Sequence, residues 1–130
     1  MTQVGIKGPF EIPYQEGTFV PVPHNLTISG GVVTYGGVWR RIGNVCFYII
    51  TVSAAVGQTT SSVAGTTYFD GLPFWLWHTN FSCHAGDTTT DLGFAGTGEN
   101  RDDGAGGRVY PPTWNLIRFS RISGWFFLTA

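Results

Sequence analysis

Apolar and polar residues alternate along this chain in short runs separated by glycine, and the longest apolar run lies near its middle. The pattern over residues 37–50 predicts two strands joined at Gly43-Asn44. Glycine lacks Cβ and asparagine tolerates the left-handed region, so this dipeptide can supply the positive φ angles of a two-residue hairpin turn. In the second strand apolar residues occupy both faces: Cys46, Tyr48, Ile50 and Val52 on one, and Val45, Phe47 and Ile49 on the other. Such a strand is covered on both sides, and we expect the second cover to come from another subunit.

Similar short runs occur throughout the rest of the chain. Glycine pairs predict a hairpin at Gly30-Gly31, between residues 26–29 and 32–35, and a break at Gly36-Gly37. The last of these runs, residues 125–128, is again apolar on both faces of the expected strand. Roughly nine to eleven short strands and no helix predict an all-β fold, an antiparallel, jelly-roll-like β-sandwich.

Two segments of the chain differ from this pattern. Residues 1–17 hold isolated apolar residues without a sustained period, which predicts an extended N-terminal arm ahead of a β-sandwich domain over 18–130. The arm either lies along a neighbouring molecule or folds back on its own domain. Residues 85–107 are small, polar and rich in glycine, and we expect one short strand near 92–94 between two long loops.

Composition narrows the choice of partners. The net charge is −1 and Lys7 is the only lysine, so no basic patch for nucleic acid is expected. No run is apolar and long enough for membrane insertion or for a signal peptide. Without a secretion signal, Cys46 and Cys83 are expected to be reduced. Aromatic residues (15%) outnumber charged ones (12%), which is typical of a surface partly covered by partners.

The residues of catalysis and metal binding do not form a recognisable pattern. There is no Gly-x-Ser-x-Gly elbow, and His78 and His84 beside Cys83 lack the spacing of zinc ligands. Several carboxylates could pair as in a glycoside hydrolase, but in glycine-rich segments they are expected as turn formers. We therefore expect no enzyme activity, no cofactor and no metal; the carboxylates are Asp87, Asp91, Glu99, Asp102 and Asp103.

Several motifs occur together in a familiar order. Gly17-Thr18-Phe19-Val20-Pro21 is followed by a glycine-rich segment, by Trp39-Arg40-Arg41-Ile42-Gly43-Asn44-Val45 and by Gly71-Leu72-Pro73-Phe74. This order resembles a small β module of tailed-bacteriophage tail fibres and other virion surface proteins, in which Tyr-Thr-Lys often stands where this chain has Trp39-Arg40-Arg41. The resemblance covers residues 17–74 well, 113–130 loosely and 75–112 weakly. It implies a trimeric β-sandwich on the outside of a virion, made in the host bacterial cytoplasm and without enzyme activity.

From the pattern and the resemblance together we expect a homotrimeric virion structural protein, a short tail fibre or receptor-binding module. The alternatives are a capsid decoration (cement) protein of the same fold and a polysaccharide depolymerase. We expect the trimer core to contain Phe47, Ile49, Trp125 and Phe127, and the arm to contact other virion proteins through Ile6, Phe10, Ile12 and Tyr14. Contacts to a host polysaccharide or protein are expected at Trp77, Asn100, Arg101, Asp102, Tyr110 and Trp114. The alternative for these aromatic residues is packing in the core or in the trimer interface.

Overall fold

A computed structural model describes the backbone of residues 2–6, 12–72, 79–86, 93–101 and 108–127. Side chains are described for residues 14–72 and 108–125. All regular structure in these ranges is β-strand, and no helix occurs in them, as the sequence predicts. The strands are β1 (Thr2–Ile6), β2 (Ile12–Phe19), β3 (Val22–His24), β4 (Thr27–Ile28), β5 (Val33–Ile42), β6 (Val45–Ala54), β7 (Thr60–Ser62), β8 (Tyr68–Asp70), β9 (Thr79–Gly86), β10 (Gly93–Arg101), β11 (Arg108–Tyr110), β12 (Trp114–Ile117) and β13 (Phe119–Phe127).

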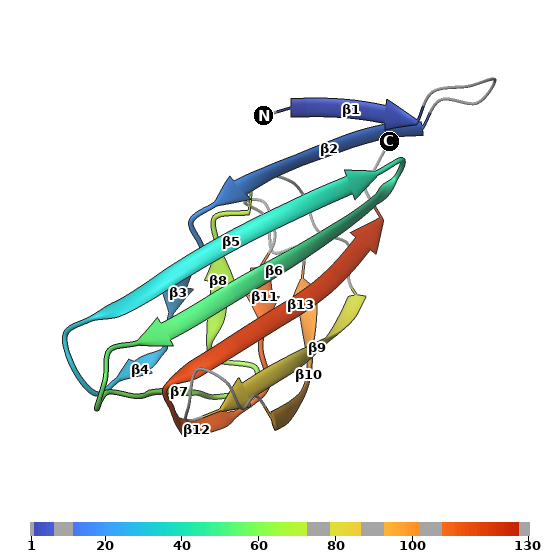
Figure 1. Cartoon of the computed structure of the whole chain (residues 1–130). Coiled ribbons are helices and arrows are strands. Elements are labelled where there is room, and N and C mark those ends of the chain that lie inside the picture. The colour runs from blue at the N-terminus through green and yellow to red at the C-terminus, as the bar shows by residue number, and fades with distance from the viewer. Residues whose placement is uncertain (1, 7–11, 73–78, 87–92, 102–107, 128–130) are drawn as a thin grey trace.

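Antiparallel pairing joins these strands into two sheets. The larger sheet has ten strands in the order β1-β2-β5-β6-β13-β9-β10-β11-β8-β3, and the smaller has three in the order β12-β7-β4. The larger sheet curls, so that β8 and β11 lie behind β5, β6 and β13 (Figure 1). Two layers facing each other across a core are consistent with a β-sandwich.

The core lies between these two layers. Tyr48, Ile50 and Val52 of β6 are almost fully buried and pack in one cluster with Phe69 of β8 and Val109 of β11. Burying a large apolar side chain stabilises a fold by about 1.5–3 kcal/mol, so this cluster holds the two layers together.

The hairpin predicted at Gly43-Asn44 is confirmed. Ile42 and Val45 are register partners, which leaves a two-residue loop between β5 and β6. Gly43 has a φ of 58°, whereas Asn44 does not adopt a positive φ. A type II′ turn needs a positive φ only at its first central residue, which here is Gly43. The expectation of a positive φ at both residues was therefore wrong for Asn44.

The other two glycine pairs do not act as predicted. β4 pairs with β7 rather than with β5, so the hairpin at Gly30-Gly31 is wrong. The backbone N–H of Ser29 donates to the Thr59 carbonyl over 3.0 Å, and this bond directs the chain toward β7. β5 also runs unbroken through Gly36-Gly37.

Gly37 stays in the strand because an aromatic ring from β2 covers it. Gly37 is the register partner of Phe19, and a Cβ on Gly37 would lie 2.6 Å from the Phe19 ring. The neighbouring row repeats the arrangement in the opposite direction, because Trp39 of β5 covers Gly17 of β2. These glycines therefore make room for aromatic rings instead of ending the strand.

Two segments expected outside the sheet contribute strands to it. Residues 12–17 belong to β2, which pairs with β5, so the expected boundary between residues 17 and 18 falls inside a strand. β10 covers residues 93–101 and pairs with both β9 and β11, so the single short strand expected near 92–94 was too short. Hydrogen bonds to two neighbours stabilise a glycine-rich strand that its own propensity does not favour.

Candidate functional site

The face of β5, β6 and β13 that points away from the core carries a group of exposed apolar side chains among polar ones such as Arg40 and Arg121. Residues of β6 alternate between nearly complete burial and exposure: Tyr48 is 1% exposed, whereas Phe47 is 45% and Ile49 38% exposed. Val38 and Ile42 of β5 and Trp125 of β13 are 46%, 44% and 46% exposed. We call Val38, Ile42, Phe47, Ile49 and Trp125 the outer patch.

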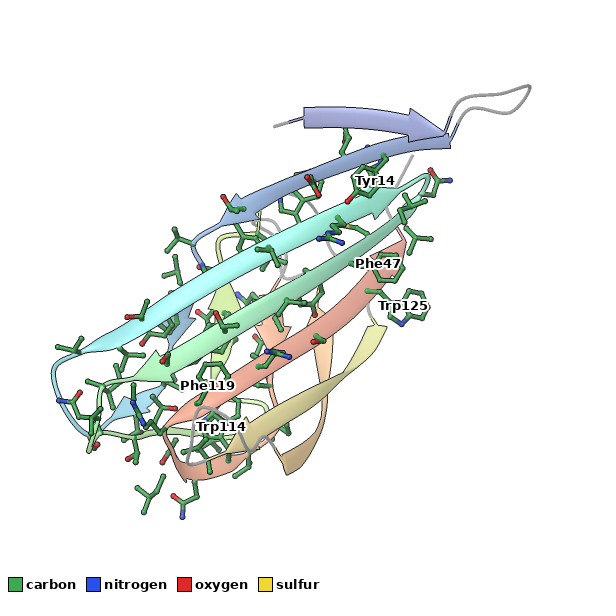
Figure 2. The ribbon with its side chains drawn as sticks, viewed as in Figure 1. Tyr14, Phe47, Trp114, Phe119 and Trp125 are labelled. Atoms are coloured by element: carbon green, nitrogen blue, oxygen red, sulfur yellow. The ribbon has the colours of Figure 1, made fainter. Side chains whose placement is uncertain are left out.

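The strand register makes the outer patch continuous. Phe47 is the register partner of Trp125 on one side and of Arg40 on the other, and Ile49 is the partner of Val38. Directly opposite residues on one face of an antiparallel pair have Cβ atoms about 5 Å apart. Figure 2 shows the rings of Phe47 and Trp125 next to each other near the tip of the β5–β6 hairpin.

The exposed area of the outer patch can be estimated from its five side chains. A fully exposed aromatic side chain presents roughly 200 Å², so five side chains at these exposures leave on the order of 450 Å² of apolar surface in water. The largest apolar patch on a typical monomer is about 300–600 Å² and often marks an interaction site. The outer patch therefore meets the size expected of a binding surface.

Polar groups lie beside the outer patch on β2 and within it at Arg40 of β5, which stands between Val38 and Ile42 on the same face. Arg40 Nε lies 3.8 Å from Glu16 Oε2, and both side chains are at least half exposed. The Tyr14 hydroxyl donates to Glu16 Oε2 over 2.8 Å, and this hydrogen bond raises the pKa of Tyr14 above its usual value. Exposed pairs of this kind contribute little to stability, and Arg40 places one charged group directly opposite Phe47 of the outer patch.

A second group of side chains lies on the outer side of β3, β8 and β11. His24 Nε2 lies 3.0 Å from Asp70 Oδ2, and the His24 ring stacks on Tyr68 with centroids 4.4 Å apart. Arg108 Cζ lies 4.3 Å from the centroid of the same Tyr68 ring, and Arg108 Nη1 donates to the Tyr110 hydroxyl over 3.4 Å. These hydrogen bonds and ring contacts connect side chains of three short strands, β3, β8 and β11, and so stabilise their association.

The sequence did not reveal this second group, apart from Tyr110. His24 is more than forty residues from Tyr68 and Asp70 along the chain, and only the pairing of β3 with β8 brings it to them. The alternation of Tyr68, Phe69 and Asp70 in a short strand is the one signal that places the first and third on the same face.

Neither group gathers the side chains of a metal site. Among the residues that the structure describes, no three His, Cys, Asp or Glu side chains gather closely enough to hold a metal ion. In the same ranges no helix is long and apolar enough to cross a membrane. The Cys46 thiol is fully buried, and burial raises its pKa to about 12, against a small opposing effect of Arg41, so it is not a nucleophile at neutral pH.

The residues expected in the trimer core come together on one side of the sheet. Phe47, Ile49 and Trp125 belong to the outer patch, and Phe127 takes the register position opposite Val45. Sequence reasoning missed Val38 and Ile42, although both alternate with buried Trp39 in the same strand.

Two of the residues expected to contact a host, Trp114 and Tyr110, are buried. Trp114 is only 4% exposed, and its indole N–H donates to Thr60 Oγ1 over 3.1 Å, which is the core role left open by the sequence. Tyr110 is 7% exposed and lies in the second group. Asn100 and Arg101 are in β10, opposite Val109 and Arg108, and Trp77 and Asp102 lie outside the described residues.

Three of the residues expected in the arm lie in the first two strands. Tyr14 is in β2 opposite Ile42, and Ile6 of β1 is opposite Ile12 of β2. Phe10 lies outside the described residues.

Comparison of the chain with models of protein families, with curated proteins and with solved structures finds no match. The outer patch is therefore the feature of the molecule from which a function can be argued.

Proposed function

We propose that this protein is a non-enzymatic structural component of a bacteriophage virion, and that its copies associate through the outer patch. The observation that supports association is the row of exposed apolar side chains on β5, β6 and β13. The phage assignment and the number of three copies rest on the sequence resemblance, whose central motif, Trp39 to Val45, forms the hairpin that carries the patch. A short tail fibre or receptor-binding module is the form we favour.

The energetics favour a partner on this face. Removing about 450 Å² of apolar surface from water contributes roughly 11 kcal/mol per copy at 25 cal/mol per Å². Association itself costs an estimated 4–15 kcal/mol, and ordering of side chains adds to that cost, so the buried apolar area favours association without fixing its affinity.

Sedimentation of the purified protein over a range of concentrations tests the association. Phe47→Asp places a charge at the centre of the outer patch and should weaken association at least about 100-fold. The matched control is Thr34→Asp, an exposed position on the same face of β5 but outside the patch, which should leave association unchanged. Sedimentation of the unaltered chain as a folded monomer at high concentration would refute the proposal.

Location on the particle tests the virion assignment and separates its forms. Gold-labelled antibodies against the chain should bind phage particles at the tail. Labelling over the head would favour a capsid decoration protein, the second candidate, and absence from particles would refute the assignment. Incubation with host polysaccharide should leave the length of the polymer unchanged, and shortening would favour a depolymerase.

A further inference from the structure

The apolar face continues past the outer patch onto the first two strands. Val4 of β1 is the register partner of Tyr14 of β2, and Tyr14 is the partner of Ile42 of β5. Ile42 in turn faces Val45, and Val45 faces Phe127 of β13. One row of apolar and aromatic residues thus crosses five neighbouring strands of the sheet.

A second pair extends this row along the same two strands. Ile6 and Ile12 are register partners, two residues along the chain from Val4 and Tyr14. Residues two apart in a strand share a face, so Ile6 and Ile12 take positions on the same face as Val4 and Tyr14. The positions between them alternate to the other face: Gln3 is the partner of Gln15 and Gly5 is the partner of Pro13.

We propose that β1 and β2 form part of the interface between copies of this chain, together with the outer patch. The occupant of this face is a second copy, and the inference rests on the proposed function. It assigns to association between copies the residues that sequence reasoning gave to an arm for other virion proteins.

The area of the outer patch leaves room for a larger interface. A stable interface buries about 800 Å² on each partner, counting polar and apolar surface together, and the outer patch offers on the order of 450 Å² of it. The rest has to come from neighbouring strands, and β2 adjoins β5 while β1 adjoins β2.

The two edges of the larger sheet support the same conclusion. β3, at one edge, has three residues and contains Pro23, a combination that prevents pairing with another strand. β1, at the opposite edge, has five residues, Thr-Gln-Val-Gly-Ile, with neither proline nor charge. Edge strands that face solvent are commonly protected by such residues, so β1 has the composition of a strand that is covered in the assembled protein.

Two double variants test the proposal at neighbouring positions. Val4→Asp with Tyr14→Asp introduces two charges on the apolar face, and Gln3→Asp with Gln15→Asp introduces two charges in the adjacent pair on the opposite face. The first should weaken association at least about 10-fold in sedimentation, and the second should change it by less than about 2-fold. Equal effects of the two, or no effect of the first, would overturn the proposal.

The charged variants could disturb the pairing of β1 with β2 itself, so a second measurement leaves both strands unaltered. Hydroxyl-radical oxidation of Tyr14, followed by mass spectrometry, should be several-fold slower in the assembled protein than in the dissociated Phe47→Asp variant. Equal oxidation rates would overturn the inference while leaving association through the outer patch intact. If Phe47→Asp did not dissociate the protein at all, the proposed function would fail instead.

Discussion

Replacing Gly124 by alanine tests whether close packing across β6 and β13 determines the choice of residue there. Gly124 is buried in β13 opposite Tyr48, and its φ is not positive, so its backbone conformation is open to alanine. A Cβ at this position overlaps the Tyr48 phenol ring, whose Cε1 would be only 2.8 Å away, whereas carbon atoms pack at about 3.5–4.0 Å.

The sign of the effect distinguishes two explanations. Propensity alone predicts that alanine stabilises the strand by about 0.5–1 kcal/mol relative to glycine. Overpacking in a closed core costs about 1–3 kcal/mol. Tyr48 is only 1% exposed and cannot move aside into solvent, so we expect overpacking to win and Gly124→Ala to lower the free energy of unfolding by about 1–2 kcal/mol.

Urea denaturation at one fixed protein concentration measures this change, because the stability of an associating protein depends on concentration. The control is Gly31→Ala, where a Cβ meets nothing within 4 Å and φ is not positive, so the midpoint should stay the same or rise slightly. Tyr48→Phe removes the hydroxyl and should reduce the loss caused by Gly124→Ala in a double-mutant cycle. A Gly124→Ala variant as stable as the unaltered protein would refute the packing argument.

Two further predictions concern the core. Trp114→Phe removes the 3.1 Å hydrogen bond to Thr60 and should lower the free energy of unfolding by about 1–2 kcal/mol; an unchanged urea midpoint would contradict the structural role of Trp114. Cys46 should resist a thiol reagent at pH 8 until the protein unfolds, as peptide mapping can show, because burial raises its pKa from 9.0 to about 12. Since the unfolded thiol ionises first, stability should fall as the pH rises from about 9 toward 12, and a cysteine-to-serine variant at position 46 should lose this part of the pH dependence.

The sequence alone determined the class of fold, the central hairpin and the two faces of β6. Alternation along one strand is a local property, since neighbouring residues must point to opposite sides, and apolar residues on both sides predicted the exposed Phe47 and Ile49 beside the buried Tyr48 and Ile50. The two-residue turn at Gly43 could be predicted for the same reason, because its geometry depends on adjacent residues alone.

Only the tertiary structure decided which strands meet. Gly37 looked like a strand breaker until Phe19, from a strand distant in the sequence, was found over it. Trp114 and the group around Tyr68 likewise take their roles from strands more than forty residues away along the chain. Strand pairing is a contact between distant segments, chosen by how well whole faces pack, and no local pattern records which of several similar short strands will become neighbours.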